Sequence, residues 1–331
     1  MPEAAAEHAV LYRPLVVLLP VFNDWTALRK LLVNLDAVSR EHGLSFQILI
    51  VDDGSTMMAE EGFTGQGFPT FECIDILRLR RNLGHQRAIA VGLAYVEDRI
   101  PCEAVILMDS DGEDDPRDVP RLLQKYRDEA EQKIIFAERT KRSETCVFQL
   151  FYSLFKLLHF ILTSRQVRVG NFSVIPAVRL ASLAVVSEMW NHYAAAVYKS
   201  RQPLALVPTQ RSQRLDGKSK MGFTNLVIHG LSAISVYSDT IGVRLLVAAT
   251  LLIGLTLAGL VGVVAVGLVA GLAIPAWATL TAGTLLAVLF QAILFSLIFS
   301  FLILGDRQGS TFLPLRDYRY FVDRVKTVYQ K

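Results

Sequence analysis

Five acidic side chains stand within seven positions of one another in the segment ILMDSDGEDDP, residues 106–116. Asp109 and Asp111 come first, two residues apart, directly after an apolar, strand-like run. In an extended backbone such a pair projects from one face, so the two carboxylates can share one cation. A hard divalent ion held by one or two carboxylates keeps positions for water and phosphate oxygens. The spacing therefore predicts Mg²⁺ or Mn²⁺ on Asp109 and Asp111, with Glu113 as a further ligand or as the holder of a metal-bound water.

The other two acids of this segment have a different expected role. Asp114 and Asp115 precede Pro116, a residue favoured in the first turn of a helix, and acids at that end stabilise the helix dipole. We expect both to cap a helix beginning at Pro116 or Arg117. A solvated turn is the alternative for the whole segment, because the D-x-D pattern often occurs by chance.

Short apolar runs alternate with helical patterns through the first part of the chain, at residues 14–22, 46–53, 73–80, 104–109 and 133–139. Such runs, apolar at nearly every position and separated by helices, indicate an α/β fold with a mainly parallel sheet covered on both faces. Ligands of these folds gather at the carboxyl ends of the strands. The polar residues at those ends are Asn23, Asp24, Asp52, Asp53, Asn82, Asp109, Asp111 and Arg139.

Several of these strand-end residues also have a purely structural interpretation. Asn23 or Asp24 is a natural N-cap for the helix that follows. The stretch DDGS at 52–55 could be only a turn. Arg139 could be a surface arginine.

A long uncharged stretch marks the C-terminal part of the chain. Residues 245–304 contain no Asp, Glu, Lys, Arg or His, whereas a membrane span needs about 20 apolar residues. We expect two transmembrane helices, 245–270 and 279–304, within 244–305. Both termini and the catalytic domain should be cytoplasmic, because basic residues flank the spans and the hairpin between them is uncharged.

The rest of the chain divides by composition. We expect a cytosolic catalytic domain at 1–225 and a cytosolic tail at 306–331. An apolar helix at 147–165 with basic flanks suits the membrane interface, although a buried core helix has the same pattern. A juxtamembrane helix is expected at 226–243. Glycines 267 and 271 permit close helix packing in a homo-oligomer, which alone is weak evidence.

Four ordered segments resemble the motifs of family-two glycosyltransferases with the GT-A fold: PVFND (20–24), VDDGS (51–55), RNLGHQRAIAVGL (81–93) and MDSDGEDDP (108–116). RLDGKSKM (214–221), followed by two spans, resembles the polyisoprenyl-phosphate glycosyltransferase branch, which includes dolichyl-phosphate mannose synthases and bactoprenol glucosyltransferases. The resemblance covers nearly the whole chain. It implies an integral protein of a prokaryotic-type inner membrane that serves the cell envelope.

The resemblance also implies an inverting, metal-dependent transfer of one sugar from a nucleotide sugar, with UDP-sugar expected before GDP-sugar, to a polyprenyl phosphate at the cytosolic membrane face. No nucleic-acid partner is implied. The metal and diphosphate would be organised by Asp109, Asp111 and Glu113. The nucleoside and donor pocket would comprise Pro20, Asn23, Asp52, Asp53, Asn82, Gly84, His85 and Gln86. Arg139 would bind the acceptor phosphate and is also expected to be catalytic. The other cations expected at this phosphate are Lys141, Arg142, Arg214, Lys218 and Lys220.

Two segments depart from the family pattern or fall outside it. In GNFSV (170–174), Asn171 and Ser173 stand where relatives commonly carry the charged residues of Asp-Phe-Arg, so a charge-dependent role of that element does not carry over. In 187–197, Glu188, Asn191 and His192 share one face if the segment is helical. Contact with the sugar and a core histidine beside a surface Glu are equally weighted interpretations.

Two other functions would use the same nucleotide site. A processive polysaccharide synthase usually carries Q-x-x-R-W, whereas TQRSQRL (209–215) has Gln213 in place of the Arg and Leu215 in place of the Trp. Two spans are also few for a polymer channel. A non-catalytic membrane protein that binds nucleotide sugars, as a sensor or a flippase partner, is the second alternative, and the acidic pair and the basic loop argue against it.

Overall fold

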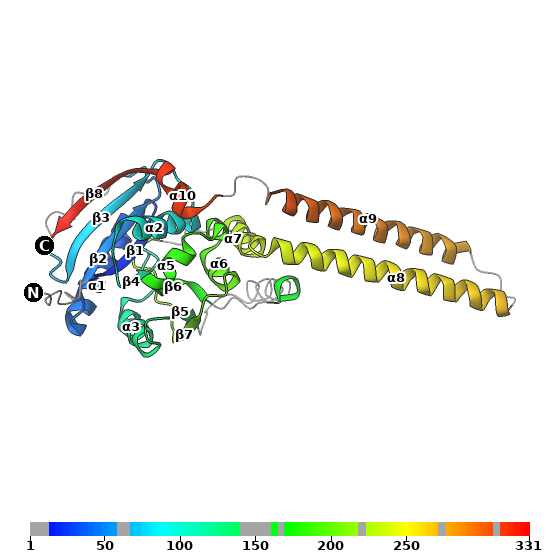
Figure 1. Ribbon diagram of the computed structural model, residues 1–331, viewed down its shortest axis with the longest axis horizontal. Helices are drawn as coiled ribbons and strands as arrows, with labels where there is room; N and C mark the ends of the chain where they lie inside the picture. The colour runs from blue at the N-terminus through cyan, green and yellow to red at the C-terminus, as the bar shows by residue number, and fades with distance from the viewer. Residues whose placement is uncertain are drawn as a thin grey trace, which may run out of the picture. The chain divides into compact units, whose positions relative to one another are not determined.

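The computed structural model describes residues 13–57, 67–139, 160–164, 169–217, 223–270, 276–306 and 312–331. The chain divides into two compact units, and Figure 1 labels the helices and strands of both. The first unit comprises residues 1–145, 167–236 and 312–331, and the second comprises 146–166 and 237–311.

The first unit is built on an eight-stranded sheet in the order β7-β5-β6-β4-β1-β2-β3-β8. Strands β1 to β5 and β7 run parallel to one another, while β6 and β8 are antiparallel to their neighbours. This arrangement confirms the predicted mainly parallel α/β sheet. The strands are β1 (Leu15–Val21), β2 (Phe46–Asp52), β3 (Phe71–Leu79), β4 (Ala104–Leu107), β5 (Ile134–Arg139), β6 (Val169–Pro176), β7 (Leu204–Thr209) and β8 (Val322–Gln330).

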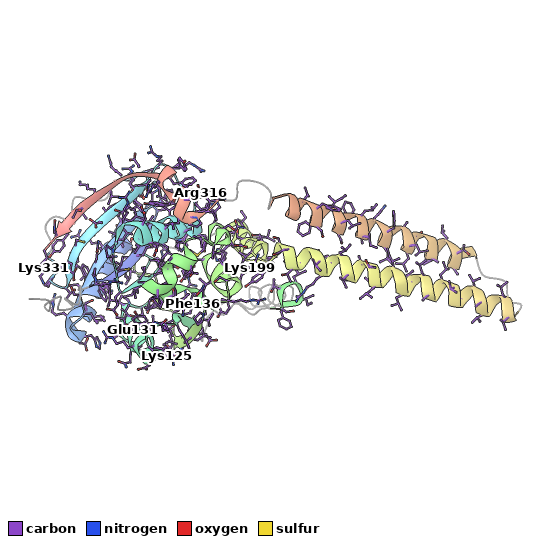
Figure 2. All side chains as sticks on the ribbon, in the orientation of Figure 1. Lys125, Glu131, Phe136, Lys199, Arg316 and Lys331 are labelled. Carbon is purple, nitrogen blue, oxygen red and sulfur yellow. The ribbon has the colours of Figure 1, made fainter. Side chains whose placement is uncertain are left out.

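Helices cover both faces of this sheet. Leu18 and Leu19 of β1 are fully buried in different hydrophobic cores, because successive strand residues point to opposite faces. The core containing Leu19 includes α1 (Trp25–His42) and α3 (Val119–Asp128). The core containing Leu18 includes α2 (His85–Arg99), α5 (Ala177–Leu183) and α6 (Tyr193–Lys199). Phe136 of β5, labelled in Figure 2, is fully buried in that second core.

Residues 312–331, within the tail predicted at 306–331, belong to the first unit and return to its sheet. Strand β8 pairs antiparallel with β3 and lies beside it in Figure 1. The short helix α10 (Pro314–Asp317) precedes it, and Tyr318 donates a hydrogen bond of 2.5 Å to Asp98. Strand β8 is mostly exposed. An edge strand needs few apolar residues, so the polar composition of this segment does not predict a strand.

The second unit contains two long apolar helices, α8 (Ser238–Ala270) and α9 (Ala276–Asp306), which lie side by side in Figure 1. The segments Ser238–Val269 and Ala278–Leu302 are long and apolar enough to cross a membrane, each with a mean hydropathy of 2.5. The predicted spans fall almost entirely within them. Of the helix expected at 147–165, all but residues 160–164 lies outside the described residues.

The helix expected at 226–243 is not one helix. Helix α7 (Phe223–Ser235) ends before Val236, and α8 begins at Ser238. The carbonyl of Val236 accepts a hydrogen bond of 2.8 Å from Lys199 Nζ at the end of α6. The side chain of Lys199, in the first unit, thus binds the backbone between the end of α7 and the start of α8.

Candidate active site

The predicted site residues come from distant segments, and the topology brings their backbones to one edge of the sheet. Strands β1 to β5 all end at this edge, since they run parallel. Strand β6 begins there, because it pairs antiparallel with β4 in a register that places Leu107 opposite Ser173. Asn171 therefore lies beyond the end of β4, beside Asp109. Arg139 pairs with Thr209, so the loop that follows β7 starts at the same edge.

The acidic segment folds into a tight loop held by its own carboxylates. The backbone N–H of Asp109 donates to Asp114 Oδ2 at 3.0 Å, and the N–H of Glu113 donates to Asp111 Oδ1 at 3.0 Å. Gly112 has a φ of +82°, and Leu215 fills the space where a Cβ would stand. Asp114 therefore closes the loop rather than capping a helix, which corrects the prediction for this residue.

The capping prediction is confirmed for Asp115. Its carboxylate accepts the backbone N–H of Arg117 at 3.0 Å, at the start of the 3-10 helix η2 (Pro116–Asp118). The Arg117 side chain contributes most to a pKa of the Asp115 carboxyl lowered to about 2, and a hydrogen bond from Ser212 adds to this effect. Asp115 is thus an ionised structural residue beside the site.

A loop that follows β7 supplies two arginines to the acids. Arg214 donates through Nη1 to Asp111 Oδ2 at 3.0 Å, and through Nη2 to Asp24. Arg211 forms an ion pair with Glu113. Asp24 stands at the N-cap position of α1 but makes no side-chain capping bond there, so capping does not explain it. The sequence predicted neither contact, since nothing local signals a partner 190 residues away, as for Asp24 and Arg214, or about half that distance away, as for Glu113 and Arg211.

The backbone of this loop is fixed against the acidic segment. The N–H of Leu215 donates to the Asp111 carbonyl at 3.0 Å, and the N–H of Ser212 donates to the Glu113 carbonyl at 2.9 Å. Lys30 of α1 pairs with Asp216 at 2.6 Å. The arginines are therefore presented to the carboxylates by a braced loop.

Asp109, the other member of the acid pair with Asp111, also has side-chain partners. Its Oδ1 lies 3.1 Å from His85 Nε2 and 3.1 Å from Asn171 Nδ2, and these two nitrogens are 2.9 Å apart. His85 is the first residue of α2, and its side chain is 43% exposed. Burial would lower the pKa of His85, but the charges of Asp109 and Asp111 outweigh it and raise the pKa.

The electrostatics of the acid pair suit a divalent cation. Burial raises the pKa of Asp111, the charge of Asp109 raises it further, and Arg214 opposes the shift. Among the described residues, no three His, Cys, Asp or Glu side chains form a ready-made metal site. The two oxygen-bearing side chains nevertheless fit Mg²⁺ or Mn²⁺ in kind, because such ions are bound by one or two carboxylates with the other positions left to water and phosphate. Arg214 places a positive charge at that position.

The predicted nucleoside side of the site is held by backbone donors. Asp53 accepts the N–H groups of Leu83 at 2.7 Å and Gly84 at 2.9 Å. Burial outweighs these bonds and raises the pKa of Asp53 to about 6. Asp52 Oδ1 accepts the N–H of Ser55 at 2.8 Å. Both carboxylates therefore fix the loops in which they lie.

Asn23 has the same kind of structural role. Its φ is +52°, and its Oδ1 accepts the N–H groups of Thr56 at 2.9 Å and Met57 at 3.0 Å. An Asn tolerates this left-handed backbone better than most residues do. Asn23 thus joins the loop after β1 to the loop after β2.

The other predicted residues are distributed as follows. Pro20 is buried in β1, Asn82 is exposed in the loop after β3, and Gly84 is the N-cap of α2 with a φ of +95°. The backbone of Arg139 ends β5 at the site edge. Its side chain lies outside the description, as do Lys141, Arg142, Lys218 and Lys220.

The segment 187–197 is not one helix, so the prediction of a shared helical face is wrong. It contains the 3-10 helix η3 (Ser187–Trp190) and then α6. His192 separates them, because its Nδ1 accepts the N–H of Ala195 at 3.3 Å as the N-cap of α6. Glu188 pairs with Lys199 at 2.9 Å. His192 is buried, which favours the core interpretation.

Comparison with known proteins identifies the class of this site. Residues 16–175 match the model of Glycosyl transferase family 2, so the chain carries a domain of this family. The mainly parallel sheet with acids after β4 agrees with the GT-A fold expected from the resemblance.

Among curated relatives, the undecaprenyl-phosphate 4-deoxy-4-formamido-L-arabinose transferase of Erwinia tasmaniensis is 31% identical over 108 residues, which cover 33% of this chain and 32% of that protein. The transferase of the same name from Serratia proteamaculans is 30% identical over 107 residues, 32% of each chain. The matched part thus spans about a third of these relatives.

Two solved structures have a related fold at 14% identity. Glucosyl-3-phosphoglycerate synthase from Mycobacterium tuberculosis, in complex with Mn²⁺, UDP-glucose and phosphoglyceric acid, has a TM-score of 0.48 over 70% of this chain and 80% of its own. Mannosyl-3-phosphoglycerate synthase from Rubrobacter xylanophilus has a TM-score of 0.46 over 68% and 73%.

Proposed function

We propose that this protein is an inverting, metal-dependent glycosyltransferase that moves a single sugar from a nucleotide sugar to a polyprenyl phosphate. One observation carries the proposal: in a family-two glycosyltransferase domain, Asp109 and Asp111 stand at a strand end, and Arg214 reaches Asp111 from another loop. The named relatives, which use undecaprenyl phosphate, support the choice of acceptor.

The donor end of the site needs charge of both signs. We propose that Asp109 and Asp111 hold Mg²⁺ or Mn²⁺, with Glu113 as an outer ligand. When bound, the ion supplies a Lewis acid for the departing nucleoside diphosphate. Arg214, predicted from the sequence as a cation for the acceptor phosphate, contacts Asp111, so we propose that its planar guanidinium binds phosphate oxygens at this end of the site in a bidentate manner. The donor pocket would lie between this acid pair and the loops of Asp52 and Asp53, with a UDP-sugar as the first candidate.

The acceptor end needs cations more than it needs a base. A lipid phosphate is already anionic near neutral pH, so no strong general base has to create the nucleophile. Residues that hold it in line can supply most of the remaining rate enhancement through orientation and electrostatics. Arg139 stands at the correct edge by its backbone register. We propose that it acts with Arg142, Lys218 and Lys220 on the acceptor phosphate.

The long helices of the second unit would anchor the protein in the membrane. Leu255 of α8 is 72% exposed and Val269 is 91% exposed, and lipid would cover such side chains. The basic residues that flank the spans, beginning with Arg244, favour a cytoplasmic catalytic unit and cytoplasmic termini in a prokaryotic-type inner membrane.

The deciding experiment is a donor screen with the purified full-length protein. Polyprenyl phosphate and Mn²⁺ are incubated with each nucleotide sugar in turn, and the lipid product is analysed by mass spectrometry. The proposal expects one donor to add the mass of one sugar. A ladder of masses would identify a processive synthase, and nucleotide-sugar binding without turnover would identify a non-catalytic binding protein.

A further inference from the structure

A buried amide connects the acid pair to two helices. Asn171, at the start of β6, is 8% exposed. Its Nδ2 donates to Asp109 Oδ1 at 3.1 Å, and its Oδ1 accepts from Gln86 Nε2 of α2 at 3.2 Å. This inference rests on the proposed metal site: we propose that Asn171 is a positioning residue that holds one oxygen of the Asp109 carboxylate, so that the acid pair is oriented for a divalent cation.

The direction of each amide in this chain of hydrogen bonds is fixed by a backbone group. The N–H of Tyr193 in α6 can only donate, and it lies 2.7 Å from Gln86 Oε1. The NH₂ of Gln86 therefore faces Asn171 and must meet its oxygen. The NH₂ of Asn171 is thereby turned towards Asp109. The backbone N–H of Tyr193 thus determines that Asp109 faces the NH₂ group of Asn171 and not its oxygen.

Burial makes this arrangement specific. Gln86 is 9% exposed, so an amide turned the wrong way would lose its partner and could not replace it readily with water. Ser173 Oγ donates to the Asn171 carbonyl at 2.9 Å and lies 2.8 Å from Tyr193 Oη. The contact with Tyr193 holds the strand against α6, and neither of these two hydrogen bonds involves Asp109. Positioning of the carboxylate and packing of the strand can therefore be tested separately.

A neutral amide suits this position better than a carboxylate would. The charge of Asp109 already raises the pKa of Asp111, and a carboxylate at 171 would present acceptor oxygens to Asp109 instead of donors. Ligating carboxylates are commonly held by outer hydrogen-bond partners, whose loss typically weakens metal binding by about 10-fold to 100-fold. We expect an effect near the lower end, because His85 also lies beside Asp109 Oδ1.

The test measures Mn²⁺ affinity by calorimetry on the full-length protein, without donor or acceptor. Asn171→Leu keeps the number and branching of the side-chain heavy atoms and removes the donor, and about a 10-fold higher Kd is expected. Gln86→Leu leaves Asn171 unoriented and should raise the Kd by a smaller factor, which provides a second measurement if Asn171→Leu does not fold. Ser173→Ala is the matched buried control on the same strand, with an expected Kd within about two-fold of the wild-type value.

The outcomes separate this inference from the proposed function. A wild-type Kd in Asn171→Leu, together with loss of Mn²⁺ binding in Asp111→Ala, would overturn the positioning role and leave the metal site intact. An equal rise in Ser173→Ala would also overturn it, by showing a general structural effect. Wild-type protein that binds no Mn²⁺ would refute both the metal site and this inference.

Discussion

Two pairs of acids stand at the same edge of the sheet, and they differ in what binds them. Asp52 and Asp53 accept three backbone N–H groups, which cannot leave unless a loop refolds, and the only side chain that pairs with them among the described residues is Arg78, 3.9 Å from Asp52. Asp111 accepts one backbone N–H, that of Glu113, but Asp109 and Asp111 mainly receive side chains, and Arg214 among them can rotate away. The difference indicates that the first pair builds the loops and that the second pair is available to a ligand. Acidity and position alone do not distinguish the two pairs.

The largest expected effect comes from Asp109 and Asp111, which we call the exchangeable pair because a ligand can replace their side-chain partners. Asp111→Ala should lower turnover by about 10³-fold, since loss of the electrostatic stabilisation of a leaving group amounts to about 4 kcal/mol. The melting temperature should stay close to that of the wild type, because this carboxylate closes one short turn and its partner Arg214 keeps the contact with Asp24. Product formation and Tm are measured on the same preparation. Asp118→Ala is the control, as Asp118 pairs with Arg121 instead. Retained activity in Asp111→Ala would remove the metal site from the mechanism.

For Asp52 and Asp53, the backbone-bound pair, substitution should lower the stability of the fold and leave Mn²⁺ binding unchanged. Asp53→Ala leaves the N–H groups of Leu83 and Gly84 without their acceptor, at a cost of about 2 kcal/mol in the free energy of unfolding. The Kd for Mn²⁺ should not change. Thermal unfolding and calorimetry provide the two values, and Asp53→Asn, which keeps one acceptor, should lose less stability. A stable Asp53→Ala protein with weakened Mn²⁺ binding would contradict the comparison.

The sequence predicted most of the frame of the site, for a physical reason. Five strands were visible because buried parallel strands are apolar throughout, and the acids after β4 were visible because their spacing is local. Strand β8 was missed, since an exposed edge strand can be polar. The partners of the acids were also missed. Arg214 reaches Asp111 only after the chain has passed through β5, β6 and β7, and no local pattern encodes that approach.

Asn171 shows the same limit from the other side. The sequence shows a neutral amide where relatives commonly carry a charged residue, and it predicts only that a charge-dependent role does not carry over. The structure shows that the amide has its own partners, Gln86 and Asp109. Whether a neutral residue has lost a function or has gained one depends on its neighbours in space.

A pH profile of stability gives a second test of the backbone-bound pair. The pKa of Asp53 is about 6 in the folded protein and near 3.8 unfolded, so the folded state binds more protons between these values. Stability should therefore fall as pH rises from about 4 to about 6, by at most about 3 kcal/mol, and level off above. Tm is recorded against pH for wild-type protein and Asp53→Asn. The variant should show a flatter profile over that range, and identical profiles would mean that Asp53 ionises normally.

The smallest expected effect concerns the arginine that occupies the exchangeable pair. Arg214 donates to Asp111 and Asp24, so a divalent ion must compete with it. The side chains of Arg214 and Asp111 are only 16% and 18% exposed, so the cost of desolvation offsets much of their attraction. A net contribution of about 0.5–1 kcal/mol means that removal of the arginine should lower the Kd for Mn²⁺ by about two-fold to five-fold. Arg214→Gln is measured by calorimetry without donor. Lys30→Gln is the matched control, because Lys30 pairs with Asp216 of the same loop and does not reach the acids. Weaker Mn²⁺ binding in Arg214→Gln would show that Arg214 supports the metal site rather than competing for it, and the division between fixed and exchangeable partners would then fail at this residue.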